Sequence, residues 1–419
     1  MRFGVSDLTQ GALSIQHSAF STQQSVCPDK TPAAEGADST GMTDQQLAEA
    51  KRYGRYELIC TLADKGLDLV YLSAVALLAA RPIDAWLKGH LPADDSLQMS
   101  LRLVAMFLAV IAGHVCVSFP LSFYSGHVLE HRFGLSTQTF GGWLWRYAKR
   151  NALAVGFGLV LVLGLYWLIW TTGPIWWLVA AGAFFVLSVL LGQLAPVLIL
   201  PLFYKIEKLD DPEITQRLAR LAQGTGLSIA GVYRIRLSQE TVKANAMLAG
   251  LGRTRRVLLG DTLLTGFTPE EIEVVFAHEI GHHIFRHIYK MIAAGILYSA
   301  AGFWICDRLL LVAVAHWDGN YRTLPVASLP LLMLILTVFA LLLEPLQNLV
   351  SRRFERQSDR YALRRTGLKD AYLSAFRKLA RLNKDDPSPH WLDVLLFHSH
   401  PPIAERLALA EQSPDDTPC

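Results

Sequence analysis

The chain has 419 residues, of which 52% are hydrophobic and only 18% are charged, against about 25% charged residues in an average soluble domain. This deficit of charge indicates a membrane protein and argues against an ordinary soluble domain. The formal net charge of +3 says little by itself, and because the sequence contains no nucleic-acid-binding motif, we expect no nucleic-acid partner.

Residues 1–45 are predicted to form a disordered polar tail. The stretch 1–43 is rich in Ser, Thr, Gln and Ala and lacks the apolar core of a signal peptide. Met42 offers a second start for translation. The folded part of the chain is therefore expected to begin near residue 46.

Six segments are apolar enough to cross a bilayer, which requires about 20 consecutive apolar residues. They are residues 66–80, 103–124, 152–170, 175–204, 291–317 and 324–343. The fourth is longer than one span needs, so we expect it to tilt or kink near Pro196 and Pro201. Spans one to four thus belong to residues 46–204, and spans five and six belong to residues 291–350.

Basic residues in the short loops set the predicted orientation in the membrane. The loop between spans two and three contains Arg146, Lys149 and Arg150, whereas the loop 171–174 contains no basic residue. By the positive-inside rule, both termini and the segment 205–290 are predicted to face the cytoplasm.

The segment 205–290 is polar enough to fold outside the membrane. Asp211 followed by Pro212 predicts the start of a helix, because aspartate suits the N-cap and proline suits the first helical position. Three short runs then change to the period of a β-strand: 232–237, 244–250 and 256–260. A small β-sheet with a Gly-rich turn is therefore expected here.

The stretch VFAHEIGHHIFRH, residues 275–287, follows a complete start signal for a helix. Thr268 can cap the first turn, Pro269 fits the first helical position, and Glu271 completes a capping box. The part VFAHEIGHH is therefore predicted to be helical.

Two histidines on this helix have the spacing of metal ligands. His278 and His282 are four residues apart and share one face, and Glu279 follows the first of them. This is the H-E-x-x-H pattern of zinc hydrolases. Two imidazoles one turn apart can bind tetrahedral zinc at about 2.0–2.1 Å, while the carboxylate reaches the metal-bound water without binding the metal.

Other interpretations of the histidines stay open at the level of the residues. His283 and His287 are also four residues apart, but no acid lies between them, so that pair has ligand spacing without a base. The cluster would also fit a purely structural role at the membrane interface.

A third protein ligand is expected after the last span. The stretch SRRFERQSD, residues 351–359, places Glu355 and Asp359 on one helical face, so Glu355 can bind the metal while Asp359 supports a ligand histidine. The competing interpretation is a solvated helix whose carboxylates pair with neighbouring arginines. Glu344 is a rival for the ligand position, but its place at the end of a span favours a buried, paired or cavity-lining role.

Four motifs together resemble those of the type-1 CAAX prenyl proteases, which are integral-membrane zinc metalloproteases of the gluzincin group. They are H-E-I-G-H followed by His287, S-R-R-F-E-x-Q-x-D from Ser351, N-A-x-x-x-G-x-G-R-T-R-R-x-x-L-x-D-T-L-L from Asn245, and H-S-H-P-P-I-x-E-R-L from His398. The likeness runs in order over about residues 44–409. It implies a predominantly α fold, in which a polytopic membrane helical bundle or barrel encloses a chamber and carries a zincin-like cytoplasmic catalytic domain with a small β-sheet.

The resemblance also implies the metal site. One Zn²⁺ per chain would be held by His278, His282 and Glu355. Glu279 would act as the general base, and Asp359 would support a ligand.

Further site residues follow from the resemblance alone. It implies that Asn245 and His400 line the site and help to hold the substrate or the developing oxyanion, with Arg406 close by. The residues by themselves would make His400 an ordinary histidine before a helix and Asn245 a turn residue.

The predicted organisation has five parts. They are the tail 1–45, spans one to four in 46–204, a zincin catalytic segment in 205–290, spans five and six in 291–350, and a C-terminal catalytic segment 351–419 that carries the third ligand. Eukaryotic members of the resembled family have seven spans, so with six it stays open whether the chamber closes in the same way.

The expected function is that of a membrane-embedded zinc metalloendopeptidase, whose partners are the lipid bilayer and a peptide or protein substrate, prenylated or membrane-embedded. Two substrate classes stay open, namely C-terminal processing of prenylated CAAX proteins and quality control of membrane proteins.

Arginine outnumbers lysine by more than two to one, which is typical of GC-rich bacteria. We therefore favour the bacterial inner membrane over the endoplasmic reticulum of a eukaryote, with the catalytic site facing the cytoplasm.

A different class of function is a zinc-binding transporter or a non-catalytic membrane scaffold. Such a protein would bind zinc without hydrolysing peptides, and Glu279 would then have no catalytic role. Cleavage within the membrane is disfavoured, because that class needs its H-E-x-x-H inside a span, whereas this helix is amphipathic and precedes one.

Overall fold

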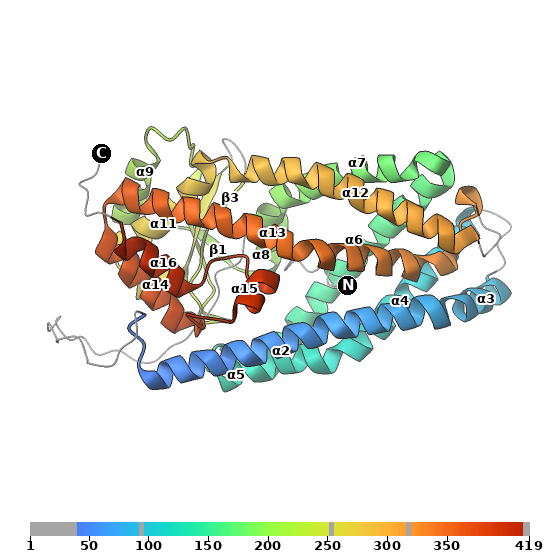
Figure 1. Cartoon of the computed structure of the whole chain (residues 1–419), viewed down its shortest axis with the longest axis horizontal. Coiled ribbons are helices and arrows are strands. Elements are labelled where there is room, and N and C mark those ends of the chain that lie inside the picture. Colours follow the sequence, from blue (N-terminus) through green and yellow to red (C-terminus); the bar gives the residue numbers. More distant parts are fainter. Residues whose placement is uncertain (1–39, 92–95, 251–254, 316–319, 414–419) are drawn as a thin grey trace.

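The computed structural model describes residues 40–91, 96–250, 255–315 and 320–413. The predicted polar tail before residue 40 and the predicted turn at 251–254 lie outside the described residues. The molecule is elongated and predominantly helical (Figure 1). A small β-sheet and short helices gather at one end of the molecule, and long helices extend from there to the opposite end.

Long helices form the membrane region. Their bounds are α2 (Asp44–Ala74), α3 (Ala80–His90), α4 (Ser96–Phe123), α6 (Phe140–Thr172), α7 (Trp176–Leu194), α12 (His287–Ala315) and α13 (Leu329–Thr366). Three π-helical turns continue these helices: η1 (Val75–Ala79) leads into α3, η2 (Tyr124–Leu129) into α5 (Glu130–Arg132), and η4 (Ala195–Ile199) into α8 (Leu200–Phe203).

Within the described residues, five helical runs are long and apolar enough to cross a membrane. The third run, Phe140–Phe203, contains the short 3₁₀ turn Gly173–Ile175, where α6 ends and α7 begins. Gly173 has φ +58°, in the left-handed region that favours glycine. The third predicted span lies in this run and the fourth overlaps it, so each of the six predicted spans overlaps one of the five runs. The tilt or kink expected near Pro196 coincides with the π-helical turn η4.

The predicted small sheet is confirmed, and it has one strand more than expected. Its strands are β1 (Ile206–Lys208), β2 (Gly231–Ile235), β3 (Ala246–Ala249) and β4 (Arg256–Gly260), in the order β1-β2-β4-β3. The pair β2–β4 is parallel, and the other two pairs are antiparallel. With only three residues, β1 carries too little alternation to be recognised in the sequence.

Short helices gather at the same end of the molecule as the sheet (Figure 1). They are α9 (Pro212–Ala222), α10 (Asp261–Gly266), α11 (Pro269–Ile284), α14 (Lys369–Asn383), α15 (Trp391–Phe397) and α16 (Ile403–Glu411). The predicted cap of α9 is confirmed, because Asp211 Oδ1 accepts a hydrogen bond from the amide of Ile214 at 3.0 Å.

One hydrophobic core joins the two polar segments of the chain. It contains Leu218 from α9, Phe276 from α11, Tyr372 from α14 and Leu407 from α16. The segments on either side of the fifth and sixth predicted spans therefore fold against each other. Helix α13 runs without a break from the membrane region into this core, so the expected boundary at residue 350 falls inside one helix (Figure 1).

Candidate metal centre

Helix α11 begins as its sequence predicts. The hydroxyl of Thr268 accepts from the amide of Glu271 at 3.3 Å, and Glu271 Oε2 accepts from the amide of Thr268 at 2.8 Å. Glu271 also receives hydrogen bonds from Ser374 at 2.6 Å and from Lys378 at 2.7 Å, both on α14. The capping carboxylate thus ties the start of α11 to a neighbouring helix and fixes the direction in which the histidines project.

Helix α11 and helix α13 cross at very close range. A Cβ atom added to Gly281 would lie 2.8 Å from the Cα of Ser358. Because backbone atoms on α13 cannot move aside without moving the helix, only glycine fits at this point. The close crossing brings the H-E-x-x-H turn of α11 against the turn of α13 that carries Glu355.

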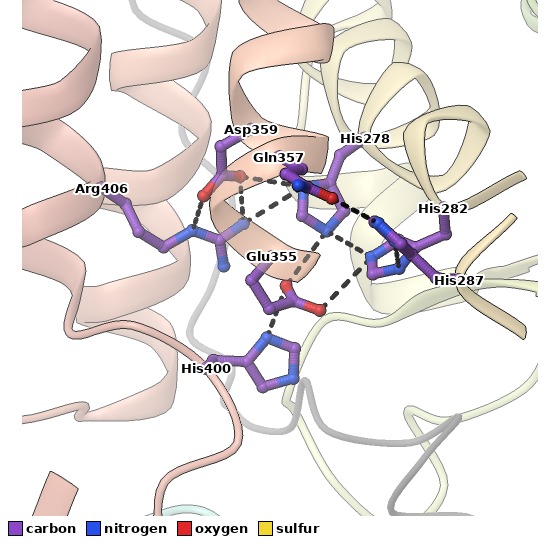
Figure 2. Close-up of polar contacts among 8 residues, drawn as sticks. All are labelled: His278, His282, His287, Glu355, Gln357, Asp359, His400 and Arg406. Atoms are coloured by element: carbon purple, nitrogen blue, oxygen red, sulfur yellow. Dashed lines mark hydrogen bonds and ion pairs between the residues drawn. The ribbon is translucent and has the colours of Figure 1, made fainter. Parts of the chain in front are cut away.

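Three side chains converge at this crossing (Figure 2). His278 Nε2 lies 3.2 Å from His282 Nε2 and 3.2 Å from Glu355 Oε2. His282 Nε2 lies 3.3 Å from Glu355 Oε1. The ligand atoms of these three residues all lie within 4.8 Å of one another, so the three residues could hold a metal ion.

The separations fit a tetrahedral zinc ion. Ligand atoms about 2.0–2.1 Å from a metal lie about 3.3–3.4 Å apart in a tetrahedron. The two histidine nitrogens lie 3.2 Å apart, and each lies 3.2–3.3 Å from its nearer Glu355 oxygen. Glu355 Oε2 is buried and has no hydrogen-bond donor, although His278 and His400 approach it to 3.2 Å and 2.8 Å. A cation between the imidazoles and the carboxylate would satisfy this oxygen.

Asp359 and Arg406 support His278 from behind. His278 Nδ1 lies 2.9 Å from Asp359 Oδ1, and Arg406 Nε donates to Asp359 Oδ2 at 3.0 Å. Burial by itself would lower the pKa of His278, but the carboxylates of Glu355 and Asp359 outweigh it and raise this pKa to about 10. The pocket therefore attracts positive charge to His278, which a metal cation can supply in place of a proton.

His400 completes the polar side of the site. It lies in the loop before α16, and its Nδ1 is 2.8 Å from Glu355 Oε2 (Figure 2). Two buried side chains of α13 hold the helix α15 and the start of the loop that follows it. Arg352 donates to the carbonyl oxygens of Val394 and His398 at 2.6 Å and 2.5 Å, and Asn348 donates to the carbonyl of Leu396 at 2.8 Å.

The other two predicted site residues are Glu279 and Asn245. Glu279 follows His278 on α11 and is partly exposed. Asn245 is buried just before β3, and its carbonyl oxygen accepts from the amide of Gly260 at 2.7 Å. Among the described residues, no hydrogen bond joins the Asn245 side chain to the ligands.

The competing interpretation of a solvated helix is wrong. Glu355 is 4% exposed and Asp359 is 0% exposed. The neighbouring arginines have other partners: Arg356 forms an ion pair with Glu405, and Arg352 binds the carbonyl groups described above. The rival ligand Glu344 lies apart from the cluster and pairs with Lys65 at 2.6 Å, which agrees with the paired role expected for it.

The expected placement of His287 is also wrong. The four-residue spacing of His283 and His287 suggested that they share a face of one helix. Helix α11 instead ends at Ile284, Arg286 adopts φ +55°, and His287 begins α12. The chain therefore turns back, and His287 Nδ1 lies 3.1 Å from His282 Nδ1 (Figure 2). His283 separately accepts a hydrogen bond from Arg255.

The sequence interpretation missed Arg352, Asn348 and Gln357 as residues of the site. Gln357 Oε1 lies 2.9 Å from His287 Nε2. Arg352 and Gln357 belong to the motif that carries Glu355, and Asn348 lies one turn before it. The sequence did offer a signal for these three residues. They are polar side chains on a helix whose first part is apolar.

Two family models match adjoining parts of the chain. Residues 208–413 match the model described as Peptidase family M48, and residues 23–205 match the model described as CAAX prenyl protease N-terminal, five membrane helices. The chain is 27% identical over 401 residues to the Bacillus subtilis protein named uncharacterized metalloprotease YhfN, covering 94% of this chain and 92% of that protein.

A eukaryotic relative and a solved structure agree with these matches. The chain is 30% identical over 316 residues to CAAX prenyl protease 1 of Saccharomyces cerevisiae, covering 70% of this chain and 68% of that protein. The fold matches the crystal structure of S. mikatae Ste24p with a TM-score of 0.75 and 23% identity, covering 88% of this chain and 90% of that chain.

Proposed function

The chain belongs to peptidase family M48, among the CAAX prenyl proteases, and from this premise we propose that it is a zinc enzyme whose ion is held by His278, His282 and Glu355. Family membership makes it an integral-membrane metalloprotease, so it acts on peptides or proteins and lies in a lipid bilayer. The observation that carries the proposed ligand set is the convergence of His278, His282 and Glu355, whose ligand atoms all lie within 4.8 Å of one another. A transporter or a non-catalytic scaffold is not favoured by the family assignment.

The proposed chemistry divides its tasks among side chains of this chain. A bound zinc ion supplies Lewis acidity, which polarises the scissile carbonyl and acidifies the attacking water. Glu279 takes a proton from that water and returns it to the leaving amine. Asp359 accepts a hydrogen bond from His278 Nδ1 and so directs Nε2 of this histidine towards the metal.

His400 is proposed to stabilise charge on the substrate. Its Nδ1 faces Glu355, which leaves Nε2 as the atom that can donate a hydrogen bond to the carbonyl oxygen where negative charge develops. Arg406 acts indirectly, because it donates a hydrogen bond to Asp359 and so holds this carboxylate in place.

The edge strand β3 is proposed to align the substrate backbone. It is the last strand of the order β1-β2-β4-β3, and among the described residues it pairs with β4 alone. Its other edge is therefore available for an extended peptide to add as a further strand. Asn245 stands at the start of this edge, where it would meet the substrate.

We place the catalytic site on the cytoplasmic face of a bacterial inner membrane. The basic loop between the second and third predicted spans supports the orientation, and similarity to a Bacillus subtilis protein over 94% of the chain supports the bacterial setting. Quality control of membrane proteins is the favoured role, and removal of the last three residues after a prenylated cysteine is the alternative. The shared core supports treating 205–290 and 351–419 as one catalytic unit.

The test compares the purified wild-type protein with Glu279→Gln. Each receives a farnesylated CAAX peptide and a loosely folded membrane protein, with and without a zinc chelator. Wild type is expected to cleave in a zinc-dependent manner, whereas the variant keeps its zinc and loses cleavage because it lacks a base. The substrate that is cleaved decides between the two roles.

Metal analysis of both proteins is the control for this test. Cleavage by Glu279→Gln at the wild-type rate would refute the assignment of the base. Zinc-loaded wild type that cleaves neither substrate would refute the protease function as proposed.

A further inference from the structure

The two ligand histidines have different partners on the side away from the metal position. His278 faces the carboxylate of Asp359, whereas His282 faces a second histidine, His287, with 3.1 Å between the two Nδ1 atoms. Two imidazole nitrogens at this distance form a hydrogen bond only when one carries a proton and the other does not. The protonation pattern of the pair therefore decides which nitrogen of His282 can bind a metal.

Gln357 fixes that pattern. The atom facing His287 Nε2 at 2.9 Å is the carbonyl oxygen of the Gln357 side chain, which can only accept. Nε2 of His287 must then carry the proton and donate it. A neutral His287 has no proton left for Nδ1, so that nitrogen accepts from the N–H at Nδ1 of His282. Nε2 of His282 is thereby left with a free lone pair, directed at Glu355 and His278 (Figure 2).

The ring of His287 is held so that it cannot turn away. It is 2% exposed, and it stacks on the ring of Phe354 with 4.1 Å between centroids and 11° between planes. Phe354 and Gln357 both belong to α13, the helix that also supplies Glu355. The support of His282 is thus built on the same rigid element as the third ligand.

We propose that His287 and Gln357 form an uncharged relay that positions His282 and fixes its tautomer for metal binding. The inference rests on the proposed zinc site and adds two positioning residues to it. The relay does for His282 what Asp359 does for His278, but it adds no negative charge. With Glu355 and Asp359 already beside the site, a third carboxylate would weaken the Lewis acidity of the ion.

The test measures zinc affinity in the purified full-length protein. Metal is removed with a chelator, and zinc is returned in competition with a chromophoric chelator. His287→Phe keeps an aromatic ring on Phe354 but removes the acceptor. His287→Asn restores an acceptor close to the position of Nδ1. His283→Phe is the matched control, because His283 neighbours the ligand in sequence but contacts Arg255.

His287→Phe is expected to weaken zinc binding by about 10- to 100-fold, which is the usual effect of removing an outer partner of a ligand histidine. His287→Asn should recover most of the loss, and His283→Phe should bind as wild type does. Cobalt replacing zinc provides a spectroscopic readout. Its visible absorption bands should shift in His287→Phe and return towards wild type in His287→Asn.

Gln357 provides an independent pair of variants, which decides the question if His287→Phe does not fold. Gln357→Leu removes the acceptor of the His287 proton and should weaken zinc binding. Gln357→Glu keeps an acceptor and should not. Thermal unfolding of the metal-free proteins shows which variants are folded.

Three results would overturn the inference. Equal zinc affinity in wild type and His287→Phe would show that the relay is not needed. Equal loss in His287→Phe and His287→Asn would show that an acceptor at this position does not restore zinc binding, which contradicts the role assigned to Nδ1 of His287. Wild type that binds no zinc in this titration would overturn the proposed metal site together with the relay, which separates that failure from the other two.

Discussion

Asp359 and Arg406 are buried charges that depend on each other. Arg406 is 5% exposed and donates to both oxygens of Asp359. Its guanidinium also lies 4.0 Å from the ring centroid of Phe376, a position in which a cation is attracted to the face of an aromatic ring. Both charges are buried, so removing one leaves the other without compensation.

Arg406→Met is therefore expected to lower the free energy of unfolding by about 3–5 kcal/mol, the usual effect of breaking a buried ion pair from one side. Denaturant unfolding of the metal-free protein in detergent measures this change. The double variant Asp359→Asn, Arg406→Met should recover part of the loss, because the stranded carboxylate is then gone. A loss below about 1 kcal/mol, the value of an exposed pair, would contradict the coupling.

His400→Ala is expected to lower kcat by about 10²- to 10³-fold, which is the usual effect of losing one donor to a developing oxyanion. Zinc affinity should stay close to wild type, because His400 is not among the three proposed ligands. Steady-state kinetics together with the zinc titration separates the two effects. His398→Ala is the matched control, since its side chain pairs with Asp393 and not with Glu355. Loss of zinc in His400→Ala would contradict the assigned role.

At the scale of elements, the site is made by the crossing of α11 and α13. One helix supplies both histidines and the other supplies Glu355, so the distance between the helix axes sets the geometry of the ligands. Gly281 permits the approach, because any side chain there would meet the backbone at Ser358. The crossing is further fixed by Glu271, which binds two residues of α14.

Gly281→Ala is expected to destabilise the protein by about 1–3 kcal/mol, as inserting a methyl group into a close-packed contact usually does. It should also weaken zinc binding, because the two helices move apart. Gly266→Ala is the control, since no atom lies within 4 Å of the added Cβ there. Thermal unfolding and the zinc titration measure the two effects. An unchanged zinc affinity in a destabilised Gly281→Ala would show that the crossing distance does not control the metal site.

At the scale of the whole molecule, the proposed zinc ion joins parts of the chain that lie far apart in sequence. His278 precedes α12, and Glu355 follows the apolar part of α13. The two segments share one hydrophobic core, so a metal bound between them adds a cross-link to existing packing. A ligand that binds only the folded state stabilises it by mass action.

Removing the metal with a chelator is expected to lower the thermal unfolding temperature. At a zinc concentration about 1,000 times the dissociation constant, the stabilisation that is lost amounts to about 4 kcal/mol. His278→Phe should unfold at the same temperature with and without the chelator, whereas Glu279→Gln should respond as wild type does. Calorimetry in detergent measures these shifts. An effect of the chelator on His278→Phe would place the stabilising metal elsewhere.

The sequence by itself determined the features whose causes are local. Six apolar runs predicted the membrane spans, and a capping box predicted where α11 begins. The four-residue spacing of His278 and His282 placed them on one face, and the same spacing joined Glu355 to Asp359. These predictions succeed because the period of a helix decides which side chains within it are neighbours.

Tertiary structure alone decided which side chains meet across elements. It separated His287 from the face of His283, since the left-handed residue Arg286 ends one helix and turns the chain back onto His282. It also brought Gln357 against His287, and Arg352 against the carbonyl groups of Val394 and His398. The physical reason is that contacts between elements depend on how closely and at what angle helices pack, which no periodicity within one helix specifies.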